Sequence, residues 1–254
     1  NELAVWSPHP RSMSPLRMEY AGKLSGIIPP PPTATNIRFI PYLLQVSGNS
    51  QGTEIGNSIT DEFKAGGEIK WVVSPTSVVD FTFNTDFAQA DVDLQVNNIS
   101  RFSVFFPERR QFFLENASLF SSGLAPVNEV IGGSMYIQPF FSRTIGLDAN
   151  VNPIAITAGS RFVYRSEKRN LGGIFMRQGE GDGDPYANFF VGRYSENFGK
   201  QNRIGILATT KSSPTSVQST GAVDAFIRFN DKFSFNGMGT ITSDSQTGDQ
   251  GLAE

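Results

Sequence analysis

Apolar and polar residues alternate along much of the chain, most regularly after Gly133. In one representative stretch every second residue is apolar: Val223, Ala225, Ile227 and Phe229. A period of two is the repeat of a β-strand that has one apolar face. The pattern predicts seven strands, at residues 134–143, 153–164, 171–178, 186–195, 202–210, 222–230 and 233–242.

Two earlier regions, residues 37–46 and 67–87, are also rich in β-branched and aromatic residues and predict further strands. Turn residues between them stand at Gly48-Asn49 and Ser74-Pro75. The stretch at residues 97–124 is different, because its phenylalanines crowd among charged residues with neither a strand nor a helix period. We expect this stretch to form an irregular insert, folded against the sheet or within a lumen.

The links between the predicted strands alternate in length along the chain. Three short links are predicted at residues 165–170, 196–201 and 230–232, and three longer ones at 179–185, 211–221 and 243–251. Outer-membrane barrels place short turns at one rim and longer loops at the other, and their strands of about 9 to 11 residues cross the hydrocarbon layer. The predicted fold class is therefore all-β, an antiparallel up-and-down transmembrane β-barrel. A soluble β-sandwich, whose strands also alternate, is the alternative fold.

A closed barrel needs a strand to join its two edges. Inside lipid an unpaired backbone N–H or C=O costs several kcal/mol, so a spanning sheet must close on itself. The predicted strands end in a polar loop near Glu254 without an obvious closing strand. We therefore expect residues 37–254 to be part of an incomplete barrel, and residues 1–36, which include four consecutive prolines, to be a linker or arm leading into it.

Composition removes several classes of function. The 254 residues carry a net charge of −3 with scattered Lys and Arg, which does not favour nucleic acid as a partner. The chain has no cysteine and one histidine, His9, so we expect no metal site, no cofactor and no histidine-based triad. No stretch approaches the roughly 18 to 20 apolar residues of a transmembrane helix, so a membrane would be crossed by strands.

Three sequence segments resemble a known family. They are NTDFAQADVD at residues 84–93, NISRFSVFFPERRQFFLE at 98–115 and FFSRTIG at 140–146. Together they resemble the DUF5916 family of bacterial proteins, common in Bacteroidetes, in which a carbohydrate-binding, family-9-like sandwich precedes a C-terminal β-barrel. The resemblance covers roughly residues 1–242, matches the barrel part, and departs from the family pattern at Gln111 and Asn116. It implies a location in the outer membrane of a Gram-negative bacterium and a link to glycan binding or uptake.

Charged residues are densest around these segments and form the candidate site. They are Asp86, Asp91, Asp93, Arg101, Glu108, Arg109, Arg110, Glu115 and Arg143. A glycosidase would need two of the carboxylates about 5 to 10 Å apart. The favoured interpretation is a structural network of paired charges in a barrel lumen, because buried charges persist mainly when they are partnered.

Three functional hypotheses follow. The first is an outer-membrane β-barrel involved in glycan binding, uptake or cell-surface machinery, whose partners are lipid, glycan or other envelope proteins. The second is a soluble periplasmic carbohydrate-active enzyme or binding module on a β-sandwich. The third is a structural subunit of an envelope complex. A role without catalysis is favoured, because no catalytic feature accompanies the carboxylates.

Overall fold

The computed structural model describes the chain in several stretches. They are residues 25–26, 36–50, 58–85, 104–105, 108, 110–122, 133–134, 138–147, 154–181, 185–199, 202–230, 232–246, 248 and 250–253. The chain divides into two units, Asn1–Thr35 and Asn36–Glu254. The helices and strands that the structure describes belong to the second unit.

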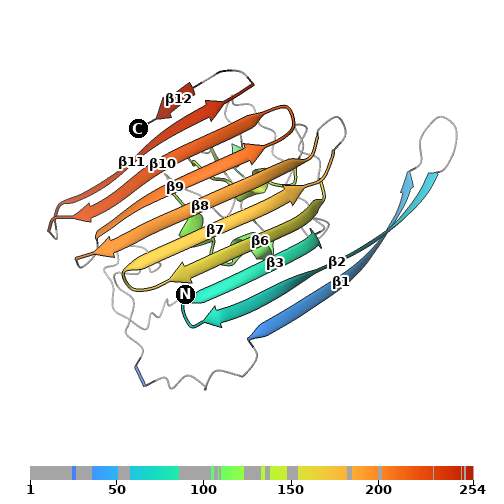
Figure 1. Cartoon of the computed structure of the whole chain (residues 1–254), viewed down its shortest axis with the longest axis horizontal. Helices are drawn as coiled ribbons and strands as arrows, with labels where there is room; N and C mark the ends of the chain where they lie inside the picture. Colours follow the sequence, from blue (N-terminus) through green and yellow to red (C-terminus); the bar gives the residue numbers. More distant parts are fainter. Residues whose placement is uncertain are drawn as a thin grey trace, which may run out of the picture. The chain divides into compact units, whose positions relative to one another are not determined.

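One large antiparallel sheet dominates the second unit (Figure 1). Its ten strands follow one another in chain order: β1 (Ile37–Ser50), β2 (Ser58–Ser74), β3 (Ser77–Thr85), β6 (Ile156–Arg165), β7 (Arg169–Gln178), β8 (Ala187–Phe198), β9 (Asn202–Ser212), β10 (Val217–Arg228), β11 (Ser234–Asp244) and β12 (Gln250–Ala253). Each strand pairs with its neighbour in sequence, apart from the interruption between β3 and β6. The all-β, antiparallel, up-and-down prediction is thus confirmed. Within the described residues β1 and β12 do not pair with each other, so the sheet is open.

The strand predicted at residues 134–143 is wrong. Of the described residues in that range, only Ser134 lies in a strand: β5 (Gly133–Ser134), which pairs with β4 (Val104–Phe105). The 3-10 helix η3 (Ser142–Thr144) follows. Pro139 has no amide hydrogen to give to a ladder, and the carbonyls of Ser142 and Ile145 accept hydrogen bonds from Arg110 instead of from a strand. This segment packs beside the sheet rather than within it.

Two turn predictions also need correction. The long link expected at residues 211–221 is only Ser213–Ser216, because β9 and β10 continue further than predicted. Their ends pair Thr209 with Thr220 and Thr210 with Ser219, and such hydroxyl-bearing residues suit paired strands. The turn expected at Gly48-Asn49 lies inside β1. The predicted rhythm of short and long links therefore fails at the link between β9 and β10.

One face of the sheet, called the inner face, packs against two short helices, α1 (Gln111–Leu114) and α2 (Ala117–Phe120). The buried apolar cluster joins helix and strand residues: Phe112, Phe113, Leu119, Phe120, Ile145, Ile156, Val163, Ile174, Met176, Ala187, Phe189, Val191, Leu207 and Ala222. Gly172 makes this contact possible, since a Cβ there would lie 2.7 Å from Leu119 Cδ2 and from Phe120 Cζ. Among the described residues no helix is both long and apolar enough to cross a membrane.

The opposite face, called the outer face, carries large apolar side chains that no described residue covers. Exposed members on successive strands are Trp71, Phe81, Phe83, Phe162, Leu171, Phe190, Ile204, Ile206, Val223, Phe235 and Ile241. Adjacent Phe189 and Phe190 show the division, because Phe189 is 7% exposed on the inner face and Phe190 is 50% exposed on the outer face. The sheet is therefore covered on one face and bare and apolar on the other.

Candidate functional site

A buried ion pair joins neighbouring strands on the inner face. Arg161 of β6 stands opposite Asp80 of β3, and its Nε and Nη2 donate to Asp80 Oδ2 at 2.9 and 2.6 Å. Both side chains are almost wholly buried, at 2% and 5% exposure. The second oxygen, Asp80 Oδ1, accepts no hydrogen bond and lies 4.0 Å from Lys70 Nζ.

The same arginine holds the end of α1. Arg161 Nη1 donates to the backbone carbonyls of Phe112 and Glu115, and Lys70 of β2 pairs with the Glu115 carboxylate. Carbonyls at the end of a helix have no partner within the helix, and cations are favoured there. Three strands of the sheet therefore supply charges that anchor α1.

A second cluster anchors Ser122, two residues after the end of α2. Arg193 of β8, only 1% exposed, pairs with Asp224 of β10, and Arg203 Nη2 lies 3.6 Å from Asp224 Oδ2. Ser122 Oγ donates to Asp224 Oδ1 at 3.2 Å. Arg193 crosses the intervening strand over Gly205, where a Cβ would lie 2.6 Å from Arg193 Nη2. A glycine is needed at that position to let the arginine reach its carboxylate.

A third cluster fixes the segment at residues 138–147. Glu108 accepts hydrogen bonds from Arg110 Nη2 and from Ser142 Oγ, both at 2.6 Å. Arg110 also donates to the carbonyls of Ile145 and Ser142, both at 2.7 Å. Burial alone would raise the pKa of the Glu108 carboxyl, but the hydrogen bonds and charge of Arg110 and the bond from Ser142 outweigh it and hold the pKa below its ordinary value.

The structure describes four of the nine residues predicted for the site. Glu108 and Arg110 contact each other, and Glu115 contacts two residues outside the predicted set, Lys70 and Arg161. Arg143 lies half-buried in η3. The remaining five lie outside the described residues: Asp86, Asp91, Asp93, Arg101 and Arg109. The full network, and the glycosidase alternative to it, therefore stay predictions.

Sequence reasoning missed the strand residues of these clusters. They are Lys70, Asp80, Arg161, Arg193 and Asp224. In each pair the two charges stand on different strands, and the pairs form only once the strands are in register. The available signal was a charged residue on the polar half of an alternating strand, which Arg161 and Asp224 both satisfy. In the described part of the chain no group of three or more His, Cys, Asp or Glu side chains could hold a metal ion.

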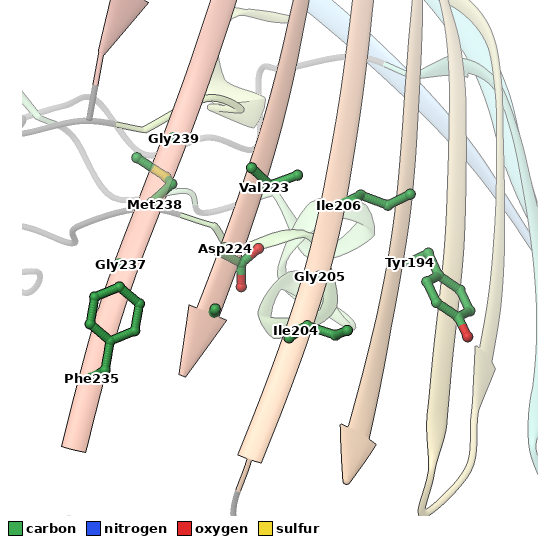
Figure 2. Close-up of a pocket in the computed structure, with 11 residues that line it drawn as sticks. Tyr194, Ile204, Gly205, Ile206, Val223, Asp224, Phe235, Gly237, Met238 and Gly239 are labelled. Carbon is green, nitrogen blue, oxygen red and sulfur yellow. The ribbon is translucent and has the colours of Figure 1, made fainter. Parts of the chain in front are cut away.

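The outer face offers a different chemistry. A shallow apolar groove of about 750 Å³ lies over β8–β11, and Figure 2 shows Tyr194, Ile204 and Ile206 along it. Gly237 and Gly239 of β11 line the groove with backbone atoms alone, and the absence of side chains there deepens the groove. Asp224 also lines the groove, but its carboxylate is paired with Arg193. The groove therefore presents apolar surface and no free charge.

Fold and site together define an all-β protein with an antiparallel up-and-down sheet, a charged and filled inner face, and an exposed apolar outer face. Residues 31–146 match a family model described as "Domain of unknown function (DUF5916)", so this part of the chain is similar to that family. The match spans β1 to η3 and includes Lys70, Asp80 and Glu115. Comparisons with curated proteins and with solved structures found no match.

Proposed function

We propose that residues 36–254 are part of an outer-membrane β-barrel whose outer face contacts lipid. The observation that carries this proposal is the polarity of the sheet. Its buried face holds paired charges such as Arg161 with Asp80, while its exposed face holds side chains such as Val223, which is 58% exposed. Transmembrane β-barrels have an apolar exterior, whereas a soluble antiparallel sheet that packs on one face presents polar side chains to water on the other.

The extent of the apolar surface supports the same proposal. Exposed aromatic and aliphatic side chains occur on strands from β1 to β11, including Phe39 at 64% and Ile241 at 56%. Monomeric soluble proteins rarely expose contiguous apolar patches above a few hundred Å². Burial of one large apolar side chain is worth roughly 1.5–3 kcal/mol, so a surface of this kind is strongly driven to find lipid or a partner.

The inner face favours a filled barrel over an open pore. Helices α1 and α2 and the segment at residues 138–147 pack on it. Two charged clusters join α1 and Ser122 to the strands, and the third joins the segment at residues 138–147 to Glu108 and Arg110. A barrel whose interior holds a folded insert suits a protein that binds or admits a specific ligand. We propose a role in handling a ligand or in cell-surface machinery, with glycan as the cargo that family resemblance suggests.

The proposal also sets a requirement on the sheet edges. An unpaired strand edge cannot face lipid, because its backbone groups would lack hydrogen-bond partners. The edges at β1 and β12 must therefore be joined to each other or to further strands in the membrane. This requirement makes closure the property to test.

Fractionation of the full-length native protein tests the proposal. We expect it to stay with outer membranes after an alkaline wash, and to migrate differently on a gel when the detergent extract is not boiled. Release by the wash as a soluble monomer without a mobility shift would contradict the proposal. Release as a stable hetero-complex would favour the envelope subunit, in which another protein covers the outer face.

A further inference from the structure

A second cavity lies on the inner face, between the segment at residues 138–147 and strands β8–β10. Its volume is about 400 Å³, and small-molecule sites span roughly 300–1,000 Å³. Phe140 and Phe141 form one wall, and Lys211 and Gln218 lie where β9 and β10 approach their link. The cavity therefore opens near the rim that carries the β9–β10 link, and none of the three charged clusters lines it.

The aromatic wall of this cavity is held firmly. Phe140 packs edge-to-face on Phe120 of α2, with ring centroids 6.4 Å apart. The backbone N–H of Gly146 donates to Gln178 Oε1 at 2.9 Å, and Ile145 beside it is fully buried. A wall fixed in this way costs little further ordering when a ligand binds.

The facing strands supply the polar groups. Register pairs Lys211 with Gln218 and Thr209 with Thr220, so one ammonium, one amide and two hydroxyls lie side by side on the inner face. Lys211 Nζ lies 5.6 Å from the centroid of the Phe189 ring, and no carboxylate among the described residues is within ion-pair distance of it. The Gln218 amide nitrogen donates to Asp244 Oδ2 at 2.9 Å, which orients the amide.

The opposite wall contributes one more amide. Gln138 lines the cavity, and its Oε1 is buried without a hydrogen-bond partner. A buried acceptor without a partner is costly, and a turn of the side chain toward a ligand hydroxyl would satisfy it. The cavity thus combines aromatic faces, hydroxyls, amides and a single cation.

We infer that this cavity binds a small polyhydroxylated carboxylate, such as a sugar acid. The Lys211 ammonium would pair with the carboxylate, the threonine hydroxyls and glutamine amides would bind hydroxyl groups, and Phe140 and Phe141 would contact the C–H faces. This inference does not rest on the membrane proposal, because the cavity is on the inner face whatever covers the outer one.

Titration calorimetry with galacturonate as the probe tests the inference. The full chain is used in detergent, or in buffer if fractionation shows it to be soluble. Ligand binding can then be tested whether or not the protein is a membrane barrel. We expect saturable binding of galacturonate and at least tenfold weaker binding of galactose, which has the hydroxyls without the charge. Equal affinity for both sugars, or no heat of binding at millimolar galacturonate, would overturn the inference.

Two variants locate the site. Lys211→Gln should lower galacturonate affinity at least tenfold, to the level of galactose, while Lys232→Gln, at the exposed β10–β11 link, should bind like the wild type. Thr220→Val should weaken both sugars. Gel mobility without boiling and the far-ultraviolet circular dichroism spectrum confirm that each variant is folded. A folded Lys211→Gln variant with unchanged galacturonate affinity would exclude this cavity as the site.

Discussion

At the scale of single residues, the inner face depends on charges that are buried and paired. Arg161 and Arg193 are 2% and 1% exposed, and each meets a carboxylate of another strand. Taking an ion out of water costs several kcal/mol, which is recovered only when its partners are in place. These pairs therefore specify which strand and which insert residue come together, more than they add net stability.

Removal of the Arg161 guanidinium should strongly destabilise the folded protein. Arg161→Met leaves Asp80 buried with only Lys70 at 4.0 Å and frees the carbonyls of α1. We expect the free energy of unfolding to fall by about 3–5 kcal/mol, measured by urea unfolding of the refolded protein. Arg169→Met is the matched control, because Arg169 is 64% exposed in its pair with Glu196 and such surface pairs contribute about 0–1 kcal/mol.

Glu108 should make stability depend on pH. The pKa of its carboxyl in the folded protein lies below its ordinary value, so Glu108 adds stability above that ordinary value, and this stability is lost as the pH falls through the folded pKa. Between pH 7 and about pH 3 the wild type should lose more unfolding free energy than Glu108→Gln. Urea midpoints across this range measure the difference, and Glu167→Gln, in the exposed β6–β7 link, should behave like the wild type. Parallel acid profiles of the wild type and Glu108→Gln would refute this role.

At the scale of elements, strand periodicity carried most of the information in the sequence. The alternation in residues 202–210 and 233–242 predicted β9 and β11 to within two residues at each end. It failed at residues 134–143, where apolar residues pack beside the sheet. Periodicity does not distinguish a short apolar segment packed on a sheet from a strand within it. It also could not show which face would be covered, because the apolar half of β9, with Ile204 and Ile206, is the exposed one.

The contact of α2 with β7 depends on a glycine. Gly172→Ala places a methyl group 2.7 Å from side-chain atoms of Leu119 and Phe120, so these side chains must shift. We expect a loss of about 1–3 kcal/mol in the free energy of unfolding, measured by urea denaturation. Gly173→Ala is the control, since the nearest atom to its Cβ is a backbone oxygen at 4.0 Å. Equal losses in the two variants would show that strand propensity, not packing of the insert, sets the effect.

At the scale of the whole molecule, the proposed membrane location depends on whether lipid or water contacts each face of the sheet. Family resemblance and link lengths predicted an up-and-down sheet, and the sheet is confirmed within the described residues, where it is open. The charged clusters could not be predicted as pairs, because Asp80 and Arg161 are 81 positions apart in the chain. Alternation fixes the face on which each residue lies. It does not say which residues of that face stand opposite each other on paired strands.

Site-directed spin labelling tests the lipid-facing surface most directly, because the chain has no cysteine of its own. Single cysteines at Ile206, Val223 and Ile241 probe the outer face, and cysteines at Thr209 and Thr220 probe the inner face. In reconstituted membranes we predict that labels on the outer face collide readily with oxygen and rarely with a water-soluble nickel complex, whereas labels on the inner face show the opposite preference. Free access of the nickel complex to the outer positions would contradict the barrel.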